Sequence, residues 1–436
     1  MRLEGEAAPH TAAGQVRRTF TSLRVRNLRL FIGGQLLSTG GTWMQSVAQP
    51  FLVLQLTHSG VALGFDTALT FLPILLVGAW GGLVADRFDN RRVQIWTQAA
   101  YGSLAVALWL LVLTGVVHVW MVYTLSFLTG CVTAVDMPTR QSFYLEMVGP
   151  EDLTNAMSLN TATFTGSRIL GAALGGLLIG AFGVGPVFLI NGITYGAVIV
   201  ALLMIRPNEL RPRRRAERKP GQVRDGVRYA WRTHRLRLPL LIMAVVFLFT
   251  YNFSVLLPLL AVRTFHGDAG TYGRMLSVFG VGSLFGALFM ASRSSRANVR
   301  NLALLAVGVG AVTTAVALVR SLALEWPLMA LLGAAGISFA ITANSTLQLN
   351  SSDEMRGRVM ALYTVVFLGT TPIGGTLSGW VGQHLNARIG LAGGGVIAVL
   401  AGLAGLAALS RRMIRDDGHD EHGERVGAAV AEGGPE

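Results

Sequence analysis

The stretch GGLVADRFDNRR, residues 81–92, places five charged residues between two long apolar runs. Only 14% of the 436 residues are charged, whereas 52% are hydrophobic and the mean hydropathy is +0.52. This composition is not typical of a soluble protein. It predicts an all-α polytopic membrane protein, because a helix needs about 20 apolar residues to cross the hydrocarbon layer. The charged stretch then lies in a turn between two membrane spans.

Apolar runs bounded by charges or turn residues recur along the whole chain. The runs of the first half are residues 28–56, 61–84, 93–116, 119–140, 155–182 and 186–206. Those of the second half are residues 237–262, 271–292, 299–319, 326–349, 357–382 and 389–410. We therefore expect 12 transmembrane helices, arranged as two six-helix pseudo-repeats around a central cavity. The expected domains are an N-tail (1–19), an N-terminal bundle (20–206), a basic linker (207–236), a C-terminal bundle (237–410) and a disordered C-tail (411–436).

The basic residues predict the orientation of the chain. With the N-terminus inside, 31 of the 36 Lys and Arg residues fall in cytoplasmic segments, as the positive-inside rule requires. We therefore expect a multi-pass protein of the inner (plasma) membrane with both termini cytoplasmic. The net charge of +13 then reflects topology, and the clustered basic face of a nucleic-acid-binding protein is absent from the sequence.

Two further patterns connect the halves. The linker contains a stretch, residues 221–237, that fits either an interfacial helix or a solvated segment held by anionic lipid. A shift of 203 residues aligns Gly171 with Gly374 and Gly176 with Gly379. A parallel repeat of this kind places a transport site between the halves, near the membrane midplane.

Within the opening stretch, residues 82–92 resemble the signature loop of the major facilitator superfamily. The resemblance implies a conformational gate at this turn and at the cytoplasmic ends of neighbouring helices, formed by Gly82, Asp86, Arg87, Arg91, Arg92, Arg140 and Gly357. Asp86 is expected to meet either the start of the eleventh helix near Gly357 or the Arg140 region. Asp89 stands where the family usually has a second glycine, and the sequence offers no explanation for it.

Other stretches narrow the resemblance to the third drug and proton antiporter group, with its macrolide-efflux and siderophore-exporter relatives. They are VDMPTRQSFYLEMVGPEDLTNAMSLN (135–160), SRILGAALGG (167–176), RGRVMALY (356–363) and GTTPIGG (369–375). The resemblance implies a secondary transporter that exports small amphipathic molecules, drug-like or siderophore-like, by alternating access coupled to proton antiport. The alternatives are an importer of a small metabolite with the same fold and a non-transporting membrane receptor or scaffold.

Three ionisable residues within predicted spans are candidates for the transport pathway, because a charge inside a span costs at least about 2.5 kcal/mol and requires a partner or a task. Arg168 either attracts an anionic substrate or holds a carboxylate, or it belongs to a structural ion pair; Asp136 is its neighbour, at a different depth. Asp66 is the better candidate for a proton carrier, because a desolvated carboxylate can load and release a proton near neutral pH. Its shallow position is equally compatible with a contact to headgroups.

Uncharged polar residues complete the expected substrate and proton pathway: Gln45, Gln49, Asn160, Asn252 and Asn344. Gln45 and Gln49 share one helix face beside Trp43 and Met44, with Tyr251, Asn252 and Phe253 expected opposite. Amides in membrane helices also serve simply as interhelical hydrogen bonds. Small residues expected to pack helices closely are Gly171, Gly175, Gly176, Gly374 and Gly375.

The sequence argues against most other chemistry. The single cysteine, Cys131, excludes a disulfide within the chain. The histidines lack metal-ligand spacing, and the chain's one lysine, Lys219, belongs to no phosphate-binding loop. We therefore expect no enzymatic activity, no cofactor, no metal and no nucleic-acid partner. The expected partners are a small-molecule substrate, protons and the lipid bilayer, and the expected oligomeric state is a monomer.

Overall fold

The computed structural model describes residues 21–211, 222–291 and 297–432, and from residue 411 onward it describes only the backbone. The described part contains helices and no strand. Helices of the first half are α2 (Arg26–Thr57), α3 (Gly60–Arg87), α4 (Asn90–Leu113), α5 (Val119–Phe182) and α6 (Gly185–Met204). Those of the second half are α7 (Gln222–Arg232), α8 (His234–Thr250), α9 (Phe253–Leu259), α10 (Ala269–Ala291), α11 (Val299–Leu318), α12 (Leu322–Leu349), α13 (Asp353–His384) and α14 (Ala387–Glu432). Short turns η1 (Thr21–Arg24), η2 (Pro207–Glu209) and η3 (Leu260–Thr264) complete the order.

Ten helices of the described chain are long and apolar enough to cross a membrane. One of them, α5, has 64 residues and contains a break at Gly149, whose φ of 77° and ψ of 175° are not helical. Glycine allows this conformation, and Pro150 cannot continue the hydrogen bonding of the preceding turn. The predicted all-helical membrane class is confirmed. The predicted count of 12 spans is not confirmed by this criterion, which counts α5 once and omits the 32-residue α2.

The seventh predicted span, residues 237–262, differs most from expectation. Helix α8 begins three residues earlier, at His234, and the chain leaves helical geometry at Tyr251 and Asn252 before α9 begins. The Asn252 side chain donates back to the carbonyl of Leu248 (2.7 Å) and so satisfies an acceptor at the break. Just before this span, α7 occupies part of the predicted linker.

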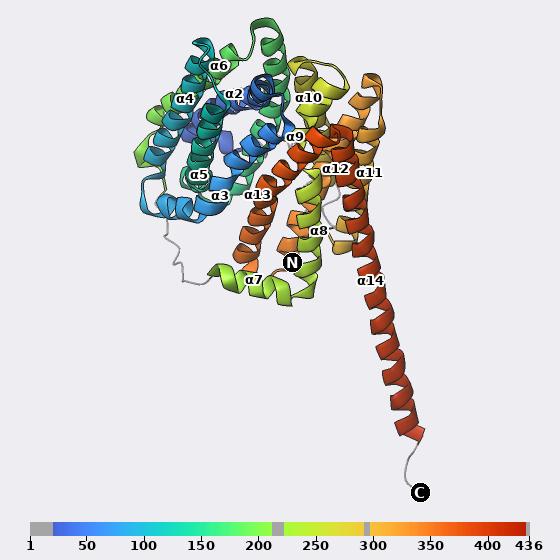
Figure 1. Ribbon diagram of the computed structural model, residues 1–436. Coiled ribbons are helices and arrows are strands. Elements are labelled where there is room, and N and C mark those ends of the chain that lie inside the picture. The colour runs from blue at the N-terminus through green and yellow to red at the C-terminus, as the bar shows by residue number, and fades with distance from the viewer. Residues whose placement is uncertain (1–20, 212–221, 292–296, 433–436) are drawn as a thin grey trace, which may run out of the picture.

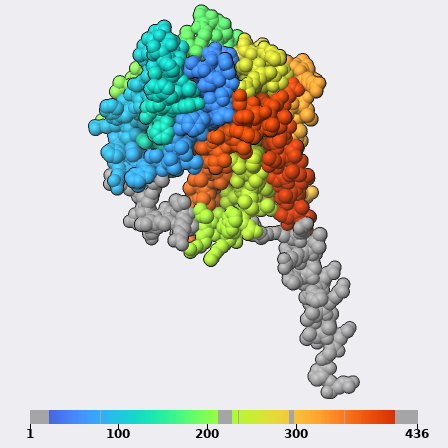
Figure 2. Space-filling view, viewed as in Figure 1, coloured from blue at the N-terminus to red at the C-terminus, as the bar shows by residue number. Residues whose placement is uncertain are grey.

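The two halves form separate lobes that touch along α3 and α13 and along α5 and α10 (Figures 1 and 2). We call the end of the molecule where α2 begins, and from which α14 projects, the tail end, and the opposite end the far end (Figure 1). Glycines related by the 203-residue shift occupy corresponding places. Gly171 packs α5 against α2 at Gly40 and Trp43, and Gly374 packs α13 against α8 at Leu248 and Asn252.

Contact between the halves uses small residues. Gly176 of α5 faces the backbone of Gly270 and Gly273 in α10, and Gly379 of α13 faces that of Gly60 and Gly64 in α3. Gly375 lies beside Thr67 of α3, and Gly175 lies against the Met44 backbone of α2 within the first half. Any larger side chain at these positions would separate the helices, because close backbone approach leaves no room for it.

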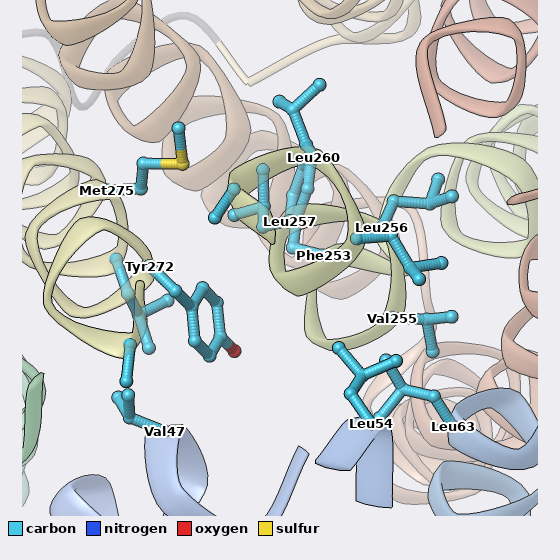
Figure 3. Close-up of a cluster of buried hydrophobic side chains, with 14 of the residues drawn as sticks. Val47, Leu54, Leu63, Phe253, Val255, Leu256, Leu257, Leu260, Tyr272 and Met275 are labelled. Atoms are coloured by element: carbon cyan, nitrogen blue, oxygen red, sulfur yellow. The ribbon is translucent and has the colours of Figure 1, made fainter. Parts of the chain in front are cut away.

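The core at the junction of the halves is apolar. Val47, Leu54 and Leu63 of the first half meet Leu256 and Tyr272 of the second around α9 (Figure 3). A separate cluster built on Phe247 and Phe339 fills the interior of the C-terminal bundle. The outer surface is also apolar, with Trp96, Phe182 and Leu349 each at least 70% exposed, as expected for side chains that face lipid.

Candidate functional site

Asp66 is buried inside the N-terminal bundle, with 4% of its surface exposed. Ser126 of α5 donates to its Oδ1 (2.5 Å), and Gln49 of α2 donates to its Oδ2 (2.9 Å). Gln49 Nε2 also lies 2.9 Å from Ser126 Oγ. Among the described residues Asp66 forms no salt bridge, so hydrogen bonds alone solvate this carboxylate.

The Asp66 cluster continues through a chain of amides. Gln45 donates to Gln49 (3.1 Å) and accepts from Asn191 of α6 (2.6 Å). These three amides line a small cavity inside the bundle. Its other walls are Tyr101, Leu104, Ala105, Leu108, Leu125, Thr129 and Tyr195.

Asp136 forms a second buried centre in the same bundle, at 1% exposure. Its Oδ2 pairs with Arg140, one helical turn on, at 3.1 Å. Its Oδ1 accepts from side chains of α4: Gln94 (3.0 Å), Thr97 (2.8 Å) and Gln98 (3.0 Å). Arg140 in turn donates to Gln35 of α2 (3.4 Å). Asp136 is therefore a fully satisfied carboxylate, and its cationic partner is Arg140, not Arg168.

Arg168 lies where the two halves meet and has no carboxylate partner in the described part of the chain. Its guanidinium carbon lies 5.8 Å from the Trp43 ring centroid in the first half and 5.6 Å from that of Phe279 in the second. Its Nε is buried without a hydrogen-bond partner. Cation–π contacts orient the guanidinium and leave its donors available to a ligand.

The predicted amides occupy three different environments. Gln45 and Gln49 bond into the first half, so the expected pairing of their face with Tyr251 and Phe253 across a central cavity is not observed. Asn160 accepts from Tyr144 across the α5 break (2.8 Å). Asn252 lies at the α8–α9 break, and Asn344 accepts from Gln348 (2.7 Å). The first-half side chain that contacts Arg168 is Trp43, which lies on α2 with Gln45 and Gln49.

The charged stretch that follows α3 is organised by capping. Asp89 is the N-cap of α4, and its carboxylate accepts from the Arg92 backbone N–H (3.0 Å). An acidic N-cap stabilises a helix start, which explains the aspartate that the sequence left unexplained. Arg91 donates to the carbonyls of Leu202 and Leu203 (2.7 and 3.2 Å) at the end of α6. The stretch therefore ties three helices of one bundle together.

The predicted gate residues lie at the end of α3 and on α4, α5 and α13. Gly82 is buried in α3, Asp86 is half-buried, and Arg87 is exposed at the end of α3. A Cβ placed on Gly357 would meet no atom within 4 Å. The contact of Asp86 with the start of α13 near Gly357, or with the Arg140 region, stays a prediction. Arg140 is engaged by Asp136.

The sequence reasoning missed several residues of these clusters. Ser126 and Asn191 are single polar residues within apolar runs and carry no spacing signal. Gln94 and Gln98 are four residues apart, a signal that could have linked them to one helix face. Glu325 fell just outside the predicted span at 326–349, but it is fully buried in α12 and both its carboxylate oxygens lack hydrogen-bond partners.

No group of three or more metal-binding side chains occurs among the described residues. A family model described as transmembrane secretion effector matches residues 17–423. The chain is 27% identical over 363 residues to the multidrug efflux pump Tap of Mycobacterium tuberculosis, a match that covers 80% of this chain and 85% of that one. It is 22% identical over 361 residues to the staphyloferrin A transporter of Staphylococcus aureus, covering 80% and 88%.

Among solved structures, the crystal structure of a point mutant of the nucleoside transporter NupG is similar to this fold. The TM-score is 0.73 at 13% sequence identity, over 87% of this chain and 98% of that one. At this identity the likeness describes the fold alone. It agrees with two helical lobes that meet along α3 and α13 and along α5 and α10.

Proposed function

Because the chain belongs to the transmembrane secretion effector family of the major facilitator superfamily, we propose that it exports small amphipathic molecules by alternating access, driven by proton antiport. The chain is a multi-pass membrane transporter for small molecules and not an enzyme. One observation carries the choice of substrate: an unpaired arginine, Arg168, held between aromatic rings of the two halves. Tap is named as a multidrug efflux pump and the other relative as a siderophore transporter, which supports export of this substrate class.

The surroundings of Arg168 favour a substrate with an apolar body and a negative group. Trp43 and Phe279 offer flat apolar contact, and Tyr251 lies within electrostatic reach of the guanidinium. An anion would satisfy the buried Nε, which the protein leaves without an acceptor. Trp43 of the first half and Phe279 of the second half both contact Arg168, so a ligand bound there would contact both halves.

Alternating access is supported by an asymmetry between the two ends. At the far end, Arg263 of η3 donates to the carbonyls of His58 (2.5 Å) and Gly382 (3.3 Å) and to Oε1 of Gln383 (2.8 Å). The same Gln383 oxygen accepts from the Gly60 N–H (2.7 Å). We call these residues the far-end latch, because they join the first half to the second. At the tail end, Gly357 has open space around it.

The orientation proposal follows from the arginines. We propose that the tail end faces the cytoplasm in the inner membrane, with both termini inside, because the sequence segments that the positive-inside rule assigns to the cytoplasm contain 31 of the 36 Lys and Arg residues. The structure then corresponds to a state closed to the outside. We propose that Asp86, Arg87, Arg91, Arg92 and Arg140 act at the gate when the tail end closes, and that the protein works as a monomer.

The test is transport by purified protein in liposomes with an imposed pH gradient. The probes are ethidium, an amphipathic cation, anilinonaphthalene sulfonate, an amphipathic anion, and staphyloferrin A. We expect gradient-driven movement of at least one probe, with the anion preferred, and Arg168→Ala reducing its transport about tenfold or more, since a charged hydrogen bond contributes about 1.5–3 kcal/mol. Arg274→Ala is the matched control, because the guanidinium carbon of Arg274 lies 5.7 Å from the ring centroid of Trp326 and both residues belong to the second half.

Several outcomes would contradict this proposal. If no probe moves under either direction of the gradient, a receptor or scaffold explains the fold better. If accumulation follows the proton gradient inward, the protein is an importer. If Arg168→Ala removes folded protein from the membrane and Arg274→Ala does not, Arg168 is structural.

A further inference from the structure

The interior of the N-terminal bundle contains a polar route that the substrate site does not use. It starts at Asp66, which accepts hydrogen bonds from Ser126 and Gln49 but has no cation beside it. A buried charge without a counter-charge is costly in a membrane protein. A proton is the smallest cation that can neutralise it.

The middle of the route is the cavity of the N-terminal bundle. It has room for a water molecule, and a buried water also needs two to four polar partners. Polar groups on its wall are Gln45, Gln49, Tyr101, Thr129, Asn191 and Tyr195. The cavity therefore satisfies both requirements for one ordered water molecule.

Two tyrosines connect the cavity to the second carboxylate. The rings of Tyr101 and Tyr195 stack with centroids 5.3 Å apart. Tyr101 donates to Thr133 (2.9 Å), one turn before Asp136, and Tyr195 shares a hydrogen bond with Thr42 (3.0 Å). Both phenols lie within electrostatic reach of Asp136 and Arg140.

The route ends at the Asp136–Arg140 pair. Asp136 is buried, whereas one third of the Arg140 side chain is exposed, so the pair joins the bundle interior to the tail-end surface. The titratable and charged groups that face this route, from α2 to α6, are Asp66, Tyr123, Tyr101, Tyr195, Tyr144, Asp136 and Arg140. The route therefore begins and ends at carboxylates, and the polar groups of the cavity wall and the Tyr101–Thr133 hydrogen bond lie between them.

We propose that protons cross the transporter through this interior, from Asp66 by way of the cavity water, Tyr101 and Tyr195 to Asp136, separately from the substrate at Arg168. The proposal rests on proton coupling in the proposed function. An outside proton converts the Asp66 carboxylate to a carboxyl. Each water or phenol on the route then passes one proton on and takes one from the preceding group, so Asp66 and these carriers are restored. Asp136 gains the proton and releases it to water at the exposed Arg140 side, which restores the carboxylate that pairs with Arg140.

The C-terminal bundle offers no comparable route in its described residues. Its interior cluster is built on Phe247, Phe339, Leu302 and Val309, with the Phe247 ring edge-on to Tyr251 and Phe367. Its buried acid, Glu325, has no hydrogen-bond partner that could accept a proton from it. This difference between the two interiors assigns proton movement to the N-terminal bundle.

The first experiment compares gradient-driven transport with equal-pH exchange of anilinonaphthalene sulfonate in liposomes. We expect Asp66→Asn, and the double variant Tyr101→Phe with Tyr195→Phe, to reduce driven transport about 100-fold, the size of a proton-transfer contribution. Exchange should persist within about twofold, because the substrate site is untouched. Tyr272→Phe is the matched control, since Tyr272 is a buried tyrosine of the other half and its change should alter neither rate.

The second experiment needs no substrate. Infrared spectra of the reconstituted protein should show a carboxyl band that appears as the pH falls and that Asp66→Asn removes. Hydrogen–deuterium exchange of that band should slow at least about tenfold in the double tyrosine variant and remain unchanged in Tyr272→Phe. A band that persists in Asp66→Asn, or exchange that ignores the tyrosines, overturns the route.

The outcomes separate the two proposals. If wild-type protein moves no probe, the proposed function fails while the infrared experiment still decides the route. If the proton gradient drives transport equally well in the wild type, in Asp66→Asn and in the double tyrosine variant, the proposed function stands and the route is wrong. If a sodium gradient at constant pH drives transport and Asp66→Asn abolishes it, the route is rejected in favour of sodium at Asp66.

Discussion

The two bundles share a helical plan but have opposite interiors. The N-terminal bundle buries Asp66 and Asp136 among amides and hydroxyls of five helices, whereas the C-terminal bundle has an aromatic cluster built on Phe247 and Phe339 and buries Glu325 without a hydrogen-bond partner. The bundles are alike at helix contacts: Gly171 packs α5 closely against α2, and Gly374 packs the equivalent helix α13 closely against the chain at Leu248 and Asn252. The difference teaches that a repeat preserves the packing of helices while the side chains between them are free to diverge in chemistry.

The largest expected effect tests the aromatic interior. Phe247→Ala should lower the free energy of unfolding by about 3–5 kcal/mol, because Phe247 is 1% exposed and truncation of a core phenylalanine leaves a cavity. Thermal unfolding in detergent measures this loss. Phe182→Ala, at a lipid-facing ring that is 70% exposed, is the control; equal losses at both sites would show that the C-terminal interior does not hold the bundle together.

The next effect tests the polar interior. Arg140→Ala should cost about 3 kcal/mol of stability, because it leaves the buried Asp136 without its cation. Adding Asp136→Asn should restore part of that stability, since the charge is then removed. Arg206→Ala breaks an exposed pair with Glu209 (2.9 Å) and should cost less than about 0.5 kcal/mol. An Arg140→Ala variant as stable as the wild type would mean that water already solvates Asp136.

A smaller effect concerns the contact between the bundles. Arg263→Gln removes charged hydrogen bonds of the far-end latch, contacts worth about 1.5 kcal/mol or more, and should shift the open-to-closed ratio of the far end about tenfold. Spin labels on cysteines introduced at the far ends of α3 and α13 can measure the ratio, after Cys131→Ser removes the native thiol. Arg388→Gln, at an arginine stacked on Phe265 (5.7 Å), is the control. Unchanged label distances in Arg263→Gln would show that the glycine contacts alone close this end.

The smallest effect compares equivalent helix starts. Asp89 caps α4, and Asn298 caps α11 in the second bundle through the Asn301 N–H (2.8 Å). Each change to alanine should cost about 1 kcal/mol, while Asp89→Asn should be nearly neutral, because both residue types are good N-caps. Unfolding measurements on the three variants decide this. A large loss in Asp89→Asn would give the negative charge a role beyond capping.

Much of the fold could be predicted from residue types alone. The apolar runs determined the helical membrane class, and the basic segment between two sets of runs separated the halves. The costly charges within the runs, Asp66, Asp136 and Arg168, also stood out, because few ionisable side chains occur there. The polar face of α2 was placed wrongly, toward the other half, and Glu325 was missed.

The sequence by itself determined the helical membrane class and which ionisable residues within the apolar runs are too costly to lack a partner or a task. Only the tertiary structure decided the partners: Asp66 with Ser126, 60 residues away, and Arg91 with the end of α6, 111 residues away. The physical reason is that lipid and protein core are equally apolar, so the sequence of a membrane helix does not mark its inward face as an amphipathic helix in water does. Inside the bundle, the direction of Gln45 and Gln49 was settled by the donors and acceptors of neighbouring helices.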